Sequence, residues 1–170
     1  MSHLNAHIIV ACPPAQAGSR LKAFLRDRGN RDGGIAKFAL SIDVEVPGLP
    51  IPLKLQRSII ATIQPHHAAG DMEPRYSVQW APEHPGQFPL FAGEFIIEGT
   101  GDYQSFIIRI VGAYTPPLGV FGKGFDAAIG NRIAQTVAND LLRRMRDTIE
   151  HDYRADEEQK RPATQGPKET

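Results

Sequence analysis

The clearest pattern in the sequence is an alternation of apolar and polar positions. In residues 35–46 every second residue from Ala36 to Val46 is apolar, with mostly polar or small residues between them. A period of two is typical of a strand with one buried and one wetter face. Residues 53–64, 75–81, 89–99 and 103–114 resemble this segment, and turns rich in Gly, Pro and Asp separate them. Because the links are short, we expect five consecutive strands to pair antiparallel.

Two segments flank this predicted meander. Residues 6–14 form an apolar run that predicts a first strand, which Pro13 and Pro14 should end. In residues 18–30, apolar positions on one face predict a short helix, with Ser19 as its N-cap and Gly29 as its stop. The alternative is that another turn of helix, at residues 15–17, precedes it. The order is therefore strand, short helix, then five strands.

The strongest single signal is an apolar residue at every fourth position from Phe125 to Ile149. This spacing predicts an amphipathic helix from about Asp126 to about Tyr153, roughly 40 Å long. Gly130, Ala134 and Ala138 add a row of small side chains that favours close packing on a partner. We expect one domain over residues 1–153 and a disordered polar tail over residues 154–170.

Composition narrows the function classes. The 170 residues carry 19 Lys and Arg and 19 Asp and Glu, so the net charge is zero and does not attract a nucleic-acid partner. Cys12 is the only cysteine, which excludes an intrachain disulfide and a cysteine zinc cluster. Apolar runs are too short for a signal peptide or stable membrane insertion. We expect a soluble cytoplasmic protein.

One short glycine-rich motif resembles a nucleotide-binding turn. Residues 122–127 read G-K-G-F-D-A, at the start of the predicted long helix. A dinucleotide fold needs a parallel strand after that helix, and none is predicted; a P-loop needs Ser or Thr where Gly124 stands. We interpret residues 112–130 as a hinge between sheet and helix that also forms part of a cavity entrance, and we expect no cofactor.

Other candidate chemistry is sparse. His66 and His67 are adjacent on an extended chain and point to opposite sides, so we expect no metal site there. No catalytic motif is recognised, which favours a binding protein over an enzyme. Arg57 and Arg109 interrupt apolar strands, and each would face either the solvent or the interior. With Tyr114, they are the candidate catalytic groups if they point inward.

This order of elements is the helix-grip pattern, in which a curved sheet wraps around a long helix. Trp80 ends a middle strand, residues 87–95 (QFPLFAGEF) open the next, and a Y-x-P-P-L-G run at 114–119 precedes the helix. In these features residues 5–153 resemble bacterial members of the START-related SRPBCC superfamily, which includes lipid-transfer START domains, polyketide cyclases and the birch-pollen allergen fold. The resemblance implies an α+β helix-grip fold with an antiparallel sheet of about six to seven strands.

The resemblance also implies a hydrophobic ligand held between the sheet and the long helix. Such pockets are mostly apolar, with a few polar groups that fix orientation. We expect the inner helix face to form one wall and two amphipathic aromatic side chains to line the mouth. The candidate ligand-binding residues are Phe125, Ile129, Ile133 and Val137 on the helix, and Trp80 and Tyr114 on the strands.

Three functions follow from this sequence. The favoured one is a binding or carrier protein for a lipid-like, isoprenoid or polycyclic small molecule. The second is a cyclase or aromatase-type enzyme acting on a polyketide-like substrate, which needs an inward ionisable group. The third is an interaction module that forms a homodimer through the sheet or through the row Gly130, Ala134 and Ala138.

Overall fold

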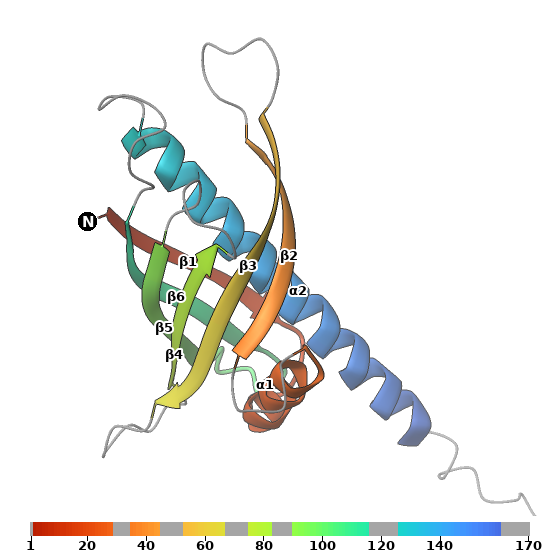
Figure 1. Cartoon of the computed structure of the whole chain (residues 1–170). Coiled ribbons are helices and arrows are strands. Elements are labelled where there is room, and N and C mark those ends of the chain that lie inside the picture. Colours follow the sequence, from red (N-terminus) through yellow and green to blue (C-terminus); the bar gives the residue numbers. More distant parts are fainter. Residues whose placement is uncertain are drawn as a thin grey trace, which may run out of the picture.

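The computed structural model describes residues 2–28, 35–44, 53–66, 75–82, 90–115 and 126–160, and it describes the side chains of most of them. The elements in chain order are β1 (Ser2–Val10), α1 (Pro14–Arg28), β2 (Ile35–Val44), β3 (Leu53–His66), β4 (Arg75–Pro82), β5 (Leu90–Gly99), β6 (Phe106–Thr115) and α2 (Asp126–Lys160) (Figure 1). This is the predicted order.

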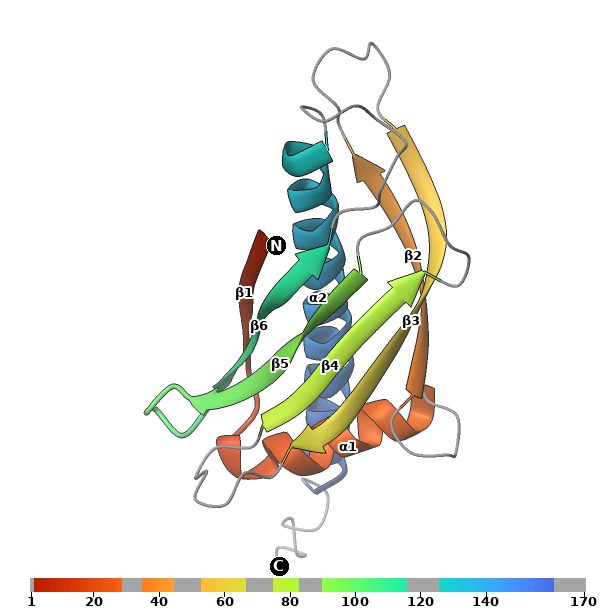
Figure 2. The same cartoon turned by 60° about the vertical axis from the view of Figure 1, so that its left-hand side comes forward.

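The six strands form one antiparallel sheet in the order β1-β6-β5-β4-β3-β2. Strands β2 to β6 are the meander predicted from the period of two, and β1 extends the sheet by pairing with β6. β1 and β2 are therefore the two edges, with α2 behind the sheet in the view of Figure 2. The α+β class, the antiparallel sheet and the long C-terminal helix are confirmed, with six strands.

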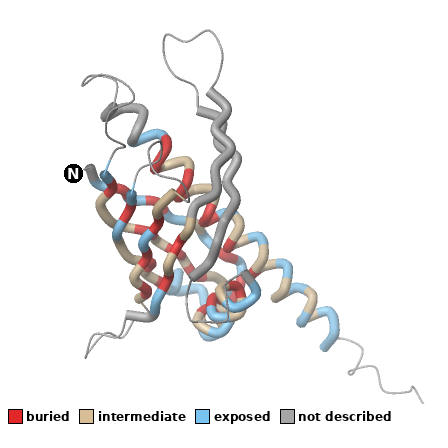
Figure 3. Tube along the Cα trace, viewed as in Figure 1, coloured by how far each residue is buried: buried red, intermediate tan, exposed pale blue. Residues whose placement is uncertain are grey.

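Burial along the strands follows the alternation in the sequence. On β4 the buried residues are Tyr76, Val78 and Trp80, and on β6 Phe106, Ile108 and Ile110 are fully buried. The residues between them are less buried and face away from α2. Figure 3 shows the buried positions gathered where α2 crosses the sheet. The core therefore lies between the inner face of the sheet and α2.

The backbone of α2 lies closest to the sheet edges. It runs beside β1 over the longest stretch and approaches β2 and β6 less extensively, whereas the described parts of β3, β4 and β5 stay farther from it. A curved sheet produces this arrangement because its edges bend toward the helix and its centre bends away. The space over the central strands is thus filled by side chains.

Helix α1 contains the alternative additional turn at residues 15–17 and therefore starts before Ser19. It begins at Pro14, and a proline suits the first helical turn because no hydrogen bond needs its missing N–H. Ser19 is therefore not an N-cap; it lies inside the helix, and its hydroxyl donates to the carbonyl of Gln16 at 2.9 Å. The prediction of that cap was wrong, because the helix includes the additional turn at residues 15–17 that was the alternative.

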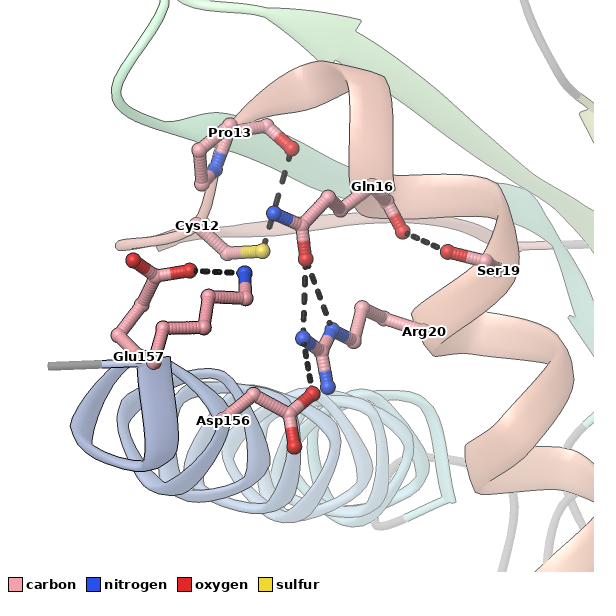
Figure 4. A network of polar contacts seen from close by, with 8 residues as sticks. Cys12, Pro13, Gln16, Ser19, Arg20, Asp156 and Glu157 are labelled. Carbon is pink, nitrogen blue, oxygen red and sulfur yellow. Dashed lines mark hydrogen bonds and ion pairs between the residues drawn. The ribbon is translucent and has the colours of Figure 1, made fainter. Parts of the chain in front are cut away.

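Helix α2 ends later than predicted, at Lys160 and not near Tyr153. Residues 154–160 are therefore helical, which corrects the first part of the expected disordered tail; residues 161–170 lie outside the described residues. Arg20 on α1 pairs with Asp156 at 2.7 Å and also donates to Gln16, as Figure 4 shows. Lys160 pairs with Glu157 at 2.6 Å. These contacts stabilise the last turns of α2, where apolar residues do not recur at helical spacing.

Candidate functional site

Three aromatic side chains form a row across the inner face of the sheet. In the strand register Trp80 on β4 is opposite Phe91 on β5, and Phe91 is opposite Tyr114 on β6. Their exposed fractions are 2%, 3% and 1%. Because directly opposed residues share one face of a sheet, the register brings these three side chains together from three separate strands.

The next row toward the middle of the sheet has no side chains at two of its positions. Gly93 on β5 is opposite Gly112 on β6. A Cβ atom at Gly93 would collide with the carbonyl oxygen of Val111, and one at Gly112 with that of Ala92. Glycine is therefore required at both positions, since the two backbones approach too closely for any larger residue. We call this glycine pair the glycine floor.

The ring of Phe91 leans over the glycine floor. Its Cζ atom lies 2.6 Å from the position that a Cβ at Gly93 would occupy, and 2.7 Å from the corresponding position at Gly112. The same ring stacks on the indole of Trp80, with centroids 3.9 Å apart and an interplanar angle of 14°. A flat space bounded by an indole face and two glycines is thus filled by one phenyl ring.

Polar groups at this site are few. Among the described residues the buried core contains no charged or amide side chain. Burial raises the pKa of the Tyr76 hydroxyl above its ordinary value. The indole Nε1 of Trp80 is fully buried and has no hydrogen-bond partner among the described residues. The interior therefore offers an apolar surface with an indole N–H donor and tyrosine hydroxyls as its polar groups.

The structure places the six predicted ligand-binding residues as follows. Trp80 and Tyr114 are buried in the aromatic row, not exposed at a mouth, and Ile133 and Val137 are buried on α2. Phe125 lies outside the described residues, and the side chain of Ile129 is not described. Four of the six therefore belong to the buried layer between sheet and helix.

Of the candidate catalytic groups that the structure describes, Arg109 faces outward and Tyr114 faces inward. Arg109 lies on the outer face of the sheet, where its guanidinium donates to Glu98 at 2.9 and 3.2 Å. Hydrogen bonding to Arg109 lowers the pKa of the Glu98 carboxyl. An inward role for Arg109 is thus wrong, because alternation along β6 points it away from Ile108 and Ile110. The side chain of Arg57 is not described, and Tyr114 points inward.

The row of small residues on α2 serves the chain's own packing. Ala134 and Ala138 are both fully buried, on the face of the helix that packs on the sheet. A homodimer cannot use these two alanines unless the helix first leaves the sheet, so this part of the dimer hypothesis is wrong. The burial of Gly130 is not described, and the outer face of the sheet is still available to a partner.

Cys12 belongs to the structural core. Its side chain is fully buried, and burial raises the pKa of its thiol, which keeps it protonated and unreactive near neutral pH. Within the described ranges no group of three or more His, Cys, Asp or Glu side chains could hold a metal ion. The helices in the described part of the chain are too polar or too short to span a membrane.

Sequence reasoning missed the central parts of this site, namely Phe91 and the glycine floor. Alternation already put Phe91 on the inner face together with Phe95, and the position between them is Gly93. Two glycines at inward positions of strand segments were the available signal. It stayed ambiguous because only the strand register shows that Gly93 and Gly112 are neighbours.

Comparison with known proteins supports the fold. No family model matches the chain, and no curated protein matches it either. A conserved protein from Geobacillus kaustophilus has a similar structure, with a TM-score of 0.55, 18% identity, and coverage of 91% of this chain and 96% of that chain. At this identity the likeness shows the fold alone.

Two further solved structures are similar at lower scores. One is a START superfamily protein from Mycobacterium smegmatis, with a TM-score of 0.47, 14% identity, and coverage of 90% of this chain and 97% of that chain. The other is an uncharacterised protein from Bacillus thuringiensis, with a TM-score of 0.48, 14% identity, and coverage of 89% and 98%. The fold of this chain is a helix-grip arrangement, with an apolar interior in the described residues.

Proposed function

We propose that the chain binds an apolar small molecule between the inner face of the sheet and α2. The observation that carries this proposal is the glycine floor, where two inward positions hold no side chain and a single phenyl ring fills the space. Small-molecule sites are concave, mostly apolar and built with few polar groups. The buried layer here has that composition, and α2 lies farther from the central strands than from the edges.

A carrier or binding role is favoured over catalysis because few ionisable groups of the described chain face the interior. A cyclase or aromatase needs an inward group that transfers or holds a proton. Arg109, one of the three candidates, faces outward in an ion pair with Glu98. Tyr114 is the candidate that is described and buried. Among the candidates whose side chains are described, the enzyme hypothesis therefore depends on the Tyr114 hydroxyl, whereas the binding hypothesis needs no ionisable group.

Native mass spectrometry of the freshly purified protein tests this function. We expect a species heavier than the bare chain by the mass of one small molecule, which organic extraction removes and which an added polycyclic such as 1-aminoanthracene replaces. A chain that carries no adduct and also fails to take up 1-aminoanthracene at one equivalent would contradict the proposal. Light scattering on the same sample reports whether the chain is a monomer or the homodimer that the sequence leaves possible.

A further inference from the structure

Strand β1 is an edge of the sheet, and the register shows which of its backbone groups bond to β6. At the hairpin between β5 and β6, the N–H of Thr100 donates to the carbonyl of Ser105 at 3.3 Å. Hydrogen-bonded and non-hydrogen-bonded pairs alternate along an antiparallel ladder, so every second residue of β6, beginning with Phe106, points its N–H and C=O groups at β1. The β1 residues opposite these are Val10, Ile8, Ala6, Leu4 and Ser2.

The residues between them therefore direct their N–H and C=O groups away from the sheet. These four outward-directed residues are His3, Asn5, His7 and Ile9. The next position in the same alternation agrees with this direction, because the N–H of Ala11 donates to the Glu150 carboxylate of α2 at 2.9 Å. Within the described part of the chain, none of the four outward-directed residues has a backbone partner on the free side of β1.

This edge lacks the features that usually prevent one strand edge from pairing with another. The β1 sequence SHLNAHIIV contains no proline and no Lys, Arg, Asp or Glu, and its pairing with β6 continues from Ser2 to Val10 without a bulge. His3, Asn5 and His7 are exposed, and Ile9 is 57% exposed. Figure 2 shows β1 as the left rim of the sheet, with α2 to its right. The edge is therefore open to another strand.

We propose that β1 pairs antiparallel with β1 of a second copy of this chain, about a two-fold axis at Ala6. The four outward-directed residues are symmetric about Ala6, so this register gives each of them a partner: His3 is opposite Ile9 of the second copy, and Asn5 is opposite His7 of the second copy. Each such pair exchanges two N–H···O=C bonds. This symmetry favours a second copy over a foreign strand, because the edge is complementary to itself.

The concentration dependence of the mass in solution tests the dimer. A single strand pairing is a small interface, so we expect a dissociation constant on the order of 10–100 µM, which sedimentation velocity between about 5 and about 500 µM measures. A chain that stays monomeric over this range would overturn the proposal. Open filaments would also overturn it, because they would show that β1 pairs with a different edge, such as β2, of the next copy.

Two substitutions on β1 test whether the edge forms the contact. Asn5→Pro removes an outward-directed N–H and no bond to β6, so it should weaken the dimer about tenfold or more. Ile9→Lys places a charge on the edge and should weaken the dimer to a similar extent. Circular dichroism and thermal unfolding verify that both variants are folded, and Ile9→Lys decides the matter if Asn5→Pro is not. A dimer that Ile9→Lys leaves unchanged would overturn the proposal.

Leu90→Lys is the matched control for Ile9→Lys. Leu90 is an aliphatic residue of similar exposure, 53%, but it lies on β5, between two other strands of the sheet. We expect this variant to dimerise like the natural chain. Equal weakening by the two lysine variants would show that the effect is not specific to the β1 edge and would overturn the proposal.

Hydrogen exchange followed by NMR tests the direction of the backbone groups. At low concentration the amides of His3, Asn5 and His7 should exchange rapidly, whereas those of Leu4 and Ala6 should be protected by β6. At high concentration the first group should become protected as well. Dimerisation without added protection at these three amides would contradict pairing through β1.

Disulfide formation tests the register. The two copies of residue 6 would face each other in a non-hydrogen-bonded pair, with Cα atoms about 4.5 Å apart, so mild oxidation should link Ala6→Cys into a covalent dimer. His7→Cys is more exposed but displaced by two residues from its own position in the second copy, so it should cross-link several-fold less. The natural chain, in which Cys12 is buried, is the control. Stronger linking of His7→Cys than of Ala6→Cys would contradict a two-fold axis at Ala6.

Discussion

At the residue scale, Gly93 and Gly112 determine how closely β5 and β6 can approach. The atoms that a Cβ would strike are mainly backbone atoms, which cannot move aside as the end of a flexible side chain can. Strand glycines of this kind mark bends and sites of close approach in sheets. Because these two glycines carry no side chains, they also leave a space on the inner face beside Trp80. The glycine floor thus accounts both for the close approach of β5 and β6 and for this space.

Gly112→Ala should therefore lower the free energy of unfolding by about 3 kcal/mol, because the new methyl group overlaps the Ala92 carbonyl and the Gly93 backbone. Gly18→Ala is the control, since an added Cβ there has nothing within 4 Å and the residue lies inside α1. It should raise stability by about 0.5–1 kcal/mol. Urea unfolding of both variants measures the difference, and equal effects would contradict the packing argument.

Asp102 carries a pH-dependent contribution in the turn between β5 and β6. Its carboxylate accepts hydrogen bonds from the Thr100 hydroxyl at 2.6 Å and from the backbone N–H of Gln104 at 2.8 Å, with Ser105 as a further donor. These bonds, above all that from Thr100, lower the pKa of Asp102 from 3.8 to about 2. A lowered pKa stabilises the fold above pH 3.8, and this contribution is lost as the pH falls toward 2.

The difference in stability between the natural chain and Asp102→Ala should therefore be constant near neutral pH and shrink between about pH 4 and about pH 2. Thermal unfolding of both proteins across this range measures it. Thr100→Val, which removes the largest single cause of the shift, should reproduce part of the effect. A difference that stays the same down to pH 2 would show that the turn bonds are not charge-assisted.

At the element scale, the alternation of apolar positions was enough to predict the strands and their order. Tyr76, Val78 and Trp80 are buried as the period of two required. The end of α2 could not be predicted in this way. Its last turns are polar, and the contact with Arg20 on α1 that supports Asp156 joins residues far apart in the sequence. Periodicity reports the buried face of a helix and says nothing about such polar supports.

Arg20 should be the main polar link between α1 and the end of α2. Its guanidinium pairs with Asp156 and lies 5.9 Å from the ring centroid of Tyr153, and its side chain is only 15% exposed. We expect Arg20→Ala to lower the free energy of unfolding by about 1 kcal/mol. Arg26→Ala, on the same helix but 79% exposed, should change it by less than about 0.5 kcal/mol. Chemical denaturation distinguishes the two, and equal losses would contradict this role.

The predicted helix wall is tested by a matched pair of substitutions on α2. Ile133 and Ile149 are both buried on the inner face, sixteen residues or about 24 Å apart. Ile133→Phe and Ile149→Phe add the same volume, so each should lower stability by about 1–3 kcal/mol. Only Ile133→Phe, within the predicted wall, should weaken 1-aminoanthracene binding by about tenfold or more. Equal affinities in a fluorescence titration would remove Ile133 from the site.

At the scale of the whole molecule, six strands hold α2 near the edges of the sheet and leave the central strands farther from it. The sequence was sufficient for this fold because the order of elements and the strand pattern both indicate a helix-grip arrangement. It was not sufficient for the site. Trp80, Phe91 and Tyr114 become neighbours only through the register of three strands, and alternation specifies the face of each residue without its partner across the sheet.

Energy transfer from Trp80 to bound 1-aminoanthracene tests the central claim most directly, because this tryptophan is the only one in the chain and lies in the aromatic row beside the glycine floor. We predict that tryptophan emission falls as probe emission rises, and that both saturate at one probe per chain. An added apolar competitor that does not absorb tryptophan emission should reverse the change. Transfer that is absent, or that grows without saturation as the probe is added, would contradict a binding site between the sheet and α2.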